Sequence, residues 1–262
     1  MFLVSYLYTI SGSILQMYSL QSKESGHIMA YDPIYKCGRS PLINGVEARR
    51  IVSGKDVAPP HANPWMVTVS AHKYQDSAKQ HSSYGCGGTL ISRKHVLSAC
   101  HCARKCNEEN ECSDKSINWA TLGDHDKRIQ DGEIYVPIIK PYHFHPQAYQ
   151  PKPPNGAFEN DYVIFTLGCC VTFTEFVQPA CFPKYHHARH VGKNVTVLGW
   201  GHTTYKGSNS PVLQFISVNV LTEKECRRIT PSIRHNPQYL MCAADNNTWD
   251  KDACQNDSGG RF

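Results

Sequence analysis

From Ile51 onward, short apolar segments alternate with turn residues along the chain. The segments are rich in β-branched and aromatic residues, which is typical of strands that pack on one face. The expected strands lie at Trp65–Val69, Thr89–Ile91, His95–Leu97, Ile134–Val136, Tyr162–Phe165, Val195–Leu198 and Phe215–Val218. This pattern predicts an all-β barrel or sandwich.

One segment has a helical signature instead. Thr222 is a residue type that favours the N-cap, and Glu225 follows three positions later, which is the spacing of a capping box. We therefore expect a helix over Thr222–Arg228.

The first fifty residues differ from the rest. Residues 1–20 are apolar and predict a secretory signal peptide, with a misassigned start or a short anchor as the alternatives. Residues 21–50 are polar, are broken by Gly and Pro, and predict an extended propeptide or light chain that contains Cys37. Arg49 and Arg50 precede Ile51 and form either a processing site or an ordinary exposed loop. Residues 51–262, which contain the expected strands, form the third predicted unit and the main domain of the chain.

Composition narrows the function classes. The net charge of +5 is scattered, without a long Lys/Arg run, which argues against nucleic-acid binding. No apolar run is long enough to predict a membrane span. Twelve cysteines among 262 residues indicate disulfides formed in an oxidising compartment, so we expect a secreted, extracellular protein.

The candidate chemistry lies near the end of the sequence. Ser258 stands between Asp257 and the Gly259-Gly260 pair, and glycines let a backbone turn bring its N–H groups close to a substrate. A serine hydroxyl is a weak nucleophile at neutral pH and needs a base and a group that orients the base. A histidine and an acid in suitable contexts both occur earlier in the chain.

Four motifs supply these contexts in order: Cys86-Gly87-Gly88-Thr89-Leu90, Ser98-Ala99-Cys100-His101-Cys102, Asn160-Asp161-Tyr162-Val163 and Gly199-Trp200-Gly201. With the serine segment, they resemble the trypsin/chymotrypsin family of serine proteases over about Cys37 to Phe262. The resemblance implies two antiparallel Greek-key β-barrels, of which the second is incomplete at the C-terminus.

The resemblance also assigns roles. Ser258 is expected to be the nucleophile, His101 the general base, and Asp161 the acid that orients His101. The backbone N–H groups of Asn256 and Ser258 would form the oxyanion hole. Asp252 would lie in the S1 substrate pocket and favour Arg or Lys before the cut, unless it is only a solvated loop acid.

Activation follows from the same resemblance. Cleavage after Arg50 would free the amine of Ile51, which would pair with Asp257 and order the pocket, so the chain would be a zymogen. The resemblance implies three disulfides, Cys37–Cys181, Cys86–Cys102 and Cys226–Cys242.

The pairing of the remaining cysteines stays open. Cys106 and Cys112 flank an acidic insertion and could bridge locally, whereas the resemblance assigns no partner to Cys100, Cys169 and Cys170. The family partner of Cys254 falls in a part that these 262 residues do not contain. The run Cys100-His101-Cys102 could also be a metal site, although the full ligand spacing of a zinc site is missing.

An acidic segment offers a candidate calcium site. The four acids Asp124, Asp126, Asp131 and Glu133 resemble the calcium loop of some trypsins, and hard oxygen donors suit Ca²⁺. The alternative is a solvated acidic loop, and we otherwise expect no cofactor.

The chain departs from the family pattern at its end. The sequence stops at Phe262, before the strands, pocket walls and helix that the family has after the serine, and Asn256 replaces a glycine. We therefore expect a trypsin-like endopeptidase zymogen whose C-terminal part is missing and whose activity is low. The alternative is a non-catalytic serine-protease homologue that binds extracellular partners. Expected partners are protein or peptide substrates, an activating trypsin-like protease, and serpin or Kunitz-type inhibitors.

Overall fold

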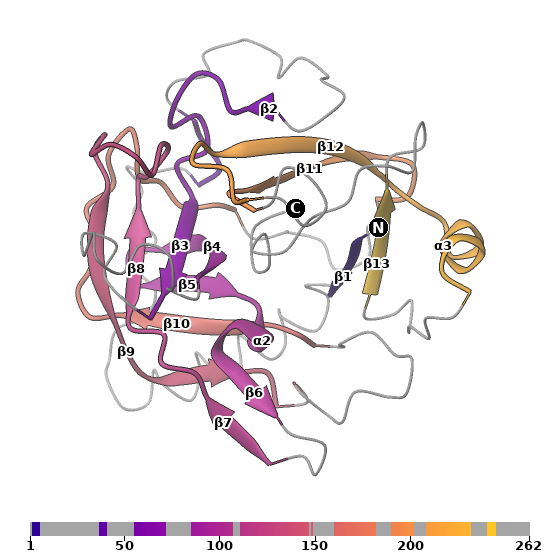
Figure 1. Ribbon diagram of the computed structural model, residues 1–262, viewed down its shortest axis with the longest axis horizontal. Coiled ribbons are helices and arrows are strands. Elements are labelled where there is room, and N and C mark those ends of the chain that lie inside the picture. The colour runs from indigo at the N-terminus through magenta and orange to yellow at the C-terminus, as the bar shows by residue number, and fades with distance from the viewer. Residues whose placement is uncertain are drawn as a thin grey trace.

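Figure 1 shows the computed structural model of the chain. The structure describes residues 2–5, 37–40, 55–71, 85–106, 111–146, 148, 160–181, 190–201, 208–231 and 240–244. Nearly all of the described chain is strand or loop, and the all-β prediction is confirmed.

Six strands close into a barrel in the order β10-β5-β4-β3-β8-β9. Their bounds are Met66–Ser70 for β3, Gly85–Ser92 for β4, His95–Ser98 for β5, Trp119–Leu122 for β8, Ile134–Phe144 for β9 and Val163–Leu167 for β10. All of the pairings are antiparallel. The barrel occupies the left half of Figure 1.

The barrel interior is filled by branched aliphatic side chains and one aromatic ring. Val67, Leu90, Val96 and Phe165 have no exposed surface, and they come from four different strands. Gly88 provides the close approach of β4 to β5, because a Cβ at this position would lie 2.8 Å from Cγ1 of Val96. The second glycine of the Cys86-Gly87-Gly88 motif therefore has a packing role in the barrel.

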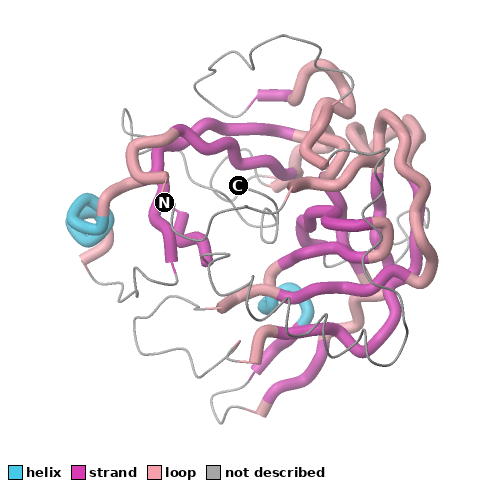
Figure 2. The backbone as a smooth tube through the Cα atoms, turned by 180° about the vertical axis from the view of Figure 1, so that it is seen from behind, coloured by secondary structure: helices cyan, strands magenta, loops and turns pink. Residues whose placement is uncertain are grey.

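A second sheet packs beside the barrel. Its path is β1-β13-β12-β11, with β2 also paired to β12. The strands span Phe2–Ser5 for β1, Lys55–Asp56 for β2, Asn194–Gly199 for β11, Gln214–Val220 for β12 and Leu240–Ala244 for β13. Figure 2 shows this sheet and the barrel from behind.

The two sheets meet at an apolar cluster and a few polar contacts. Met66 of the barrel packs with Leu198, Trp200 and Leu213 of the second half. The indole N–H of Trp200 donates to the carbonyl oxygen of His125 at 3.1 Å. The chain segment after β8 is thereby fixed against the residue that follows β11.

Two helices and a small hairpin complete the described structure. Helix α3 (Glu223–Ile229) has the predicted capping box, since Thr222 Oγ1 accepts from Glu225 N and the Glu225 side chain accepts from Thr222 N. Helix α2 (Cys100–Ala103) is a single turn. It leads into the hairpin of β6 (Arg104–Cys106) and β7 (Cys112–Asp114), which projects from the barrel in Figure 1.

The division into a signal peptide, a light chain and a peptidase domain stays a prediction, because most of residues 1–54 lie outside the described residues. Within the described part of the chain, no helix has the length and apolar character that a bilayer crossing requires.

Candidate active site

The position of His101 is fixed by the turn that contains it. Strand β5 ends at Ser98, and α2 begins two residues later. Cys102, which follows His101, is fully buried and forms a disulfide with Cys86 of β4. The carbonyl oxygen of His101 accepts a hydrogen bond of 2.8 Å from Lys115 Nζ. The helical turn is therefore held both by a covalent bond to the barrel and by a side chain beyond the hairpin.

Asp161 reaches the site from the neighbouring strand. The residue lies just before β10, whose first residue, Val163, pairs with Ser98 at the end of β5. This register brings the start of β10 beside the turn that follows β5. The preceding Asn160 is buried and has a φ of 53°, a left-handed conformation that asparagine tolerates better than most residues.

The two side chains make a double contact. Oδ2 of Asp161 lies 2.6 Å from Nδ1 of His101, and Oδ1 accepts the backbone N–H of the same histidine at 2.9 Å. The carboxylate thus fixes both the backbone and the ring. The side chains are 13% and 29% exposed, so the pair is shielded while the ring still reaches the surface.

This geometry selects a tautomer of the imidazole. A carboxylate can only accept a hydrogen bond, so Nδ1 of His101 carries the proton in the neutral ring. Nε2 then holds the lone pair and can act as a base. The Sγ of Cys102 lies 3.7 Å from Nε2 and has no proton to donate, because it is part of a disulfide.

Cys100 is the other reactive residue type beside His101. Its side chain is fully buried and has no disulfide partner. Burial, and secondarily the carboxylate of Asp161, raises the pKa of this thiol to about 12. The thiol therefore stays protonated at neutral pH and is not a plausible nucleophile.

The metal-site alternative does not fit this geometry. The sulfur atoms of Cys86 and Cys102 and a ring nitrogen of His101 lie within 4.8 Å of one another. The two sulfur atoms are bonded to each other, however, and a disulfide offers no thiolate to a metal ion.

All three disulfides that the resemblance implied are present, as is the local bridge. Cys37 joins Cys181, Cys226 joins Cys242, and Cys106 joins Cys112 at the end of the β6–β7 hairpin. Among the described cysteines, Cys100, Cys169 and Cys170 are unpaired.

The other predicted site residues lie outside the described residues. These are Arg50, Ile51, Asp252, Asn256, Asp257 and Ser258, and their roles stay predictions. His145, a polar residue that follows β9, is buried against the ring of Tyr162 with 5.0 Å between the ring centroids. Burial lowers the pKa of His145.

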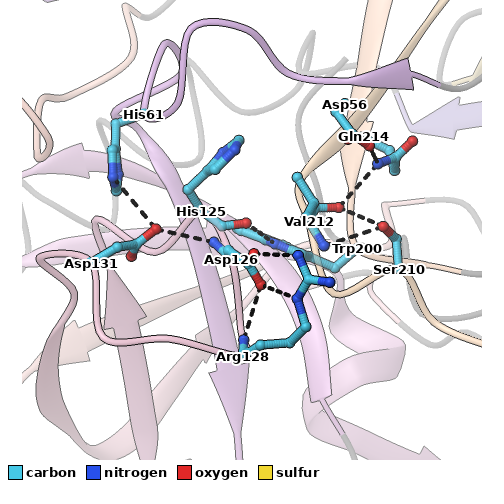
Figure 3. A network of polar contacts seen from close by, with 10 residues as sticks. All are labelled: Asp56, His61, His125, Asp126, Arg128, Asp131, Trp200, Ser210, Val212 and Gln214. Carbon is cyan, nitrogen blue, oxygen red and sulfur yellow. Dashed lines mark hydrogen bonds and ion pairs between the residues drawn. The ribbon is translucent and has the colours of Figure 1, made fainter.

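Two of the candidate calcium acids, Asp126 and Asp131, appear in Figure 3, where each contacts a different basic side chain. Asp126 is bound by the guanidinium of Arg128, and Asp131 approaches Nε2 of His61 at 3.5 Å. The carboxylate of Glu133 accepts from the backbone N–H of Asp131 at 2.9 Å. Among the described residues, no three of these carboxylates bring oxygen atoms within 4.8 Å of one another. These contacts engage three of the four carboxylates, and calcium binding at this segment stays a prediction.

The fourth acid, Asp124, faces an internal cation instead. Burial raises the pKa of Asp124 to about 6, and the nearby Lys127 opposes this shift. The Lys127 ammonium donates to Thr68 Oγ1 at 3.1 Å and lies 4.7 Å from the ring centroid of Trp200. Burial lowers the pKa of Lys127 to about 8. A lysine ammonium thus supplies the positive charge beside Asp124.

Some contacts at the site had no signal in the sequence. The hydrogen bond from Lys115 to His101 depends on the hairpin that brings residue 115 back to residue 101. The backbone N–H of Lys115 donates to the carbonyl oxygen of Ala103 at 2.6 Å and closes this hairpin at its base. Only the cysteine pair at 106 and 112 could have pointed to it.

Comparison with known proteins points to one family. The model of the family described as Trypsin matches residues 51–262. A venom protease of Bombus pensylvanicus is 32% identical over 215 residues, which cover 80% of this chain and 80% of the relative. The proclotting enzyme of Tachypleus tridentatus is 30% identical over 228 residues, which cover 83% of this chain and 56% of that enzyme.

Two further comparisons extend this result. Venom serine protease 34 of Apis mellifera is 34% identical over 178 residues, which cover 67% of this chain and 40% of the relative. The solved structure "Structure of GrC" has the same fold, with a TM-score of 0.61 and 24% identity over 80% of this chain and 82% of the other. The chain belongs to the trypsin family of serine proteases.

Proposed function

We propose that the protein is a secreted serine endopeptidase, made as a zymogen, that cuts proteins after Arg or Lys. The observation that supports this most strongly is the double contact of Asp161 with the backbone and ring of His101. This contact leaves Nε2 as the basic nitrogen, which is what a serine nucleophile requires. Family membership supplies the expectation that the nucleophile is Ser258.

The proposed reaction has two halves. His101 Nε2 takes the proton of Ser258 Oγ as the oxygen attacks the substrate carbonyl, and the carboxylate of Asp161 stabilises the resulting imidazolium. The imidazolium then gives this proton to the leaving amine. Water hydrolyses the acyl-enzyme by the same route. The backbone N–H groups of Asn256 and Ser258 would stabilise the oxyanion.

Substrate choice rests on Asp252. A carboxylate in a pocket away from water pairs well with a guanidinium or an ammonium, which favours Arg and Lys before the cut. Asp252 lies outside the described residues, so its place in a substrate pocket stays a prediction.

Activation would use the bond between Arg50 and Ile51. The new ammonium of Ile51 would pair with Asp257, and a second trypsin-like protease would make the cut. The disulfide between Cys37 and Cys181 would then keep the preceding segment attached to the peptidase part. One relative by sequence is called a proclotting enzyme, and a precursor name of this kind supports activation by proteolysis.

Secretion is supported by two observations. Four disulfides form among the described cysteines, which suits an oxidising compartment. Two of the relatives are venom proteases.

A fluorophosphonate probe tests the proposal. The full chain, cleaved after Arg50, should be labelled, and digestion with mass spectrometry should place the label on Ser258. Ser258→Ala is the control that must remove the label, and uncleaved chain should label more slowly. A cleaved, folded chain that takes up no label would favour the non-catalytic homologue, in which Asn256 disturbs the oxyanion turn.

A further inference from the structure

Two unpaired cysteines stand side by side where β10 ends. Cys169 and Cys170 are both exposed, and neither is in a disulfide. The backbone on each side is fixed to neighbouring strands, since Gly168 N donates to Pro137 O at 2.7 Å and Val171 N donates to Arg93 O at 2.8 Å. The turn therefore presents both thiols to solvent from an anchored backbone.

The turn that carries the thiols begins at Gly168, which packs against exposed apolar side chains of β9. A Cβ at Gly168 would lie 3.0 Å from Cγ of Pro137 and 3.5 Å from Cγ2 of Ile139, so the turn packs directly on this strand. Pro137 is exposed, and Ile139 is 44% exposed, one of the most exposed large apolar residues of the described chain. We call Pro137, Ile139, Cys169 and Cys170 the dithiol patch.

The dithiol patch is remote from the candidate active site. Asp161 lies just before the first residue of β10, whereas the patch follows its last residue. The four residue steps of β10 span roughly 13 Å at the usual rise of a strand. A partner bound at the patch would leave His101 accessible.

A disulfide within the patch is disfavoured by geometry. Consecutive Cα atoms lie about 3.8 Å apart across a trans peptide, and disulfides usually need about 4.4–6.8 Å. Eight of the other described cysteines are already in four disulfides, and Cys100 is fully buried. Among the described residues, the accessible thiols are therefore those of the patch itself.

We propose that the dithiol patch is a covalent dimer contact between two copies of this chain. In a two-fold symmetric contact, residue i of one copy meets residue j of the other, and j meets i. Cys169 would bond to Cys170 of the partner subunit, and Cys170 to Cys169 of the partner subunit. This arrangement pairs all four thiols with two interchain bonds, and Pro137 and Ile139 would become buried in the same contact.

The chemistry is thiol–disulfide exchange. For each interchain bond, two thiols lose two protons and two electrons to one molecule of a small oxidised disulfide such as oxidised glutathione, which becomes two thiols.

The exposed lysines beside the patch, Lys94 and Lys140, bring like charges together in the dimer. Salt screens such charges, so the dimer should form faster at higher ionic strength.

The test uses the full chain in a glutathione redox buffer, analysed by non-reducing gel electrophoresis and by mass spectrometry of the digest. We expect a dimer band that disappears on reduction and a cross-linked peptide pair that contains Cys169 and Cys170. A Cys169→Ser/Cys170→Ser double variant should stay monomeric, and Cys254→Ser should still dimerise. Circular dichroism checks that the variants are folded.

Two single variants test the cross-pairing. Cys169→Ser alone and Cys170→Ser alone should each form little covalent dimer, whereas an equimolar mixture should form a heterodimer through the remaining Cys170 and Cys169. Monomeric wild-type chain in the redox buffer would overturn the proposal. So would a bond within one chain, to the neighbouring cysteine or to Cys254, or capping of the thiols by glutathione without a dimer.

Discussion

At the scale of single residues, the site depends on how one carboxylate is used. Asp161 accepts from the backbone and from the ring of His101, so the histidine has one orientation and one tautomer. The neighbouring Cys100 is chemically silent because burial raises its pKa to about 12. The oriented histidine and the protonated thiol together favour a serine hydroxyl over the Cys100 thiol as the nucleophile beside His101.

Replacing Asp161 by Asn tests the orienting role. The amide nitrogen of Asn can donate to Nδ1 and would then stabilise the tautomer in which Nε2 carries the proton. We expect the kcat of the activated chain to fall by about 10⁴-fold. Kinetics on a peptide substrate measure the change.

The matched control is Asp114→Asn, which removes the carboxylate that pairs with Arg104 at 3.2 Å in the hairpin. This variant should keep its kcat within a few-fold. An Asp161→Asn chain as active as the control would contradict the assigned role.

Asp124 gives a pH-dependent prediction. Its pKa in the fold is raised from 3.8 to about 6, so the fold favours the protonated carboxyl. The stabilisation is fully present below about pH 3.8 and is lost as pH rises to about 6. Wild type should therefore lose roughly 2–3 kcal/mol of its free energy of unfolding between pH 4 and pH 7 that the Asp124→Asn variant does not lose. Urea unfolding of both proteins at the two pH values measures this difference.

Asp126→Asn is the control, because its effect on stability should depend on pH in the opposite direction. The guanidinium of Arg128 lowers the pKa of Asp126, so its stabilisation is present above the usual pKa and lost as pH falls. Parallel pH curves for wild type and Asp124→Asn would show that Asp124 is not buried as described.

The sequence allowed His101 and Asp161 to be paired because each stands in a family motif, and the structure brings them within 2.6 Å. The contact from Lys115 could not be foreseen, since it depends on an insertion whose hairpin returns the chain to residue 101. The burial of His145 could not be foreseen either, because it depends on packing against Tyr162, which lies 17 positions further along the chain.

At the scale of elements, the prediction was accurate for the starts of several strands. β3, β5, β11 and β12 begin within one residue of the expected positions. β9 was expected at Ile134–Val136 but runs to Phe144, because Pro137 and Pro141 interrupt the sequence pattern without ending the strand. β9 pairs with β8 in its first part and with β10 in the rest, so it links two sides of the barrel.

The disulfide beside α2 gives a prediction for an element. Cys86 and Cys102 are 16 residues apart, and chain entropy alone gives about 3 kcal/mol for a loop of this size. The Cys86→Ser/Cys102→Ser variant should lose about this much free energy of unfolding, and its activity should fall because the His101 turn loses its anchor. Denaturant unfolding and kinetics measure both effects.

The matched comparison is Cys106→Ser/Cys112→Ser, which opens a loop of six residues in the exposed hairpin. We expect a loss of about 2 kcal/mol. If removal of the hairpin disulfide lowered activity as much as removal of the Cys86–Cys102 bond, the Cys86–Cys102 bond would not be the main anchor of the His101 turn.

At the scale of the whole molecule, the site depends on the barrel, and its predicted remainder lies in residues 245–262, outside the described part. β5 and β10 of the barrel position His101 and Asp161. The second sheet is attached through Trp200, Leu213 and the carbonyl of His125. The fold class was predictable from strand patterning, whereas the junction of the two halves was not, because it joins segments about 75 positions apart.

The most direct test of the proposed activity is cleavage of a protein substrate. The chain, cut after Arg50, is incubated with a denatured protein, and mass spectrometry identifies the C-terminal residue of each new peptide. We predict that Arg and Lys dominate these ends and that the Ser258→Ala chain gives none of the products. Absence of products from a folded, cleaved chain, or equal cleavage by Ser258→Ala, would contradict the account.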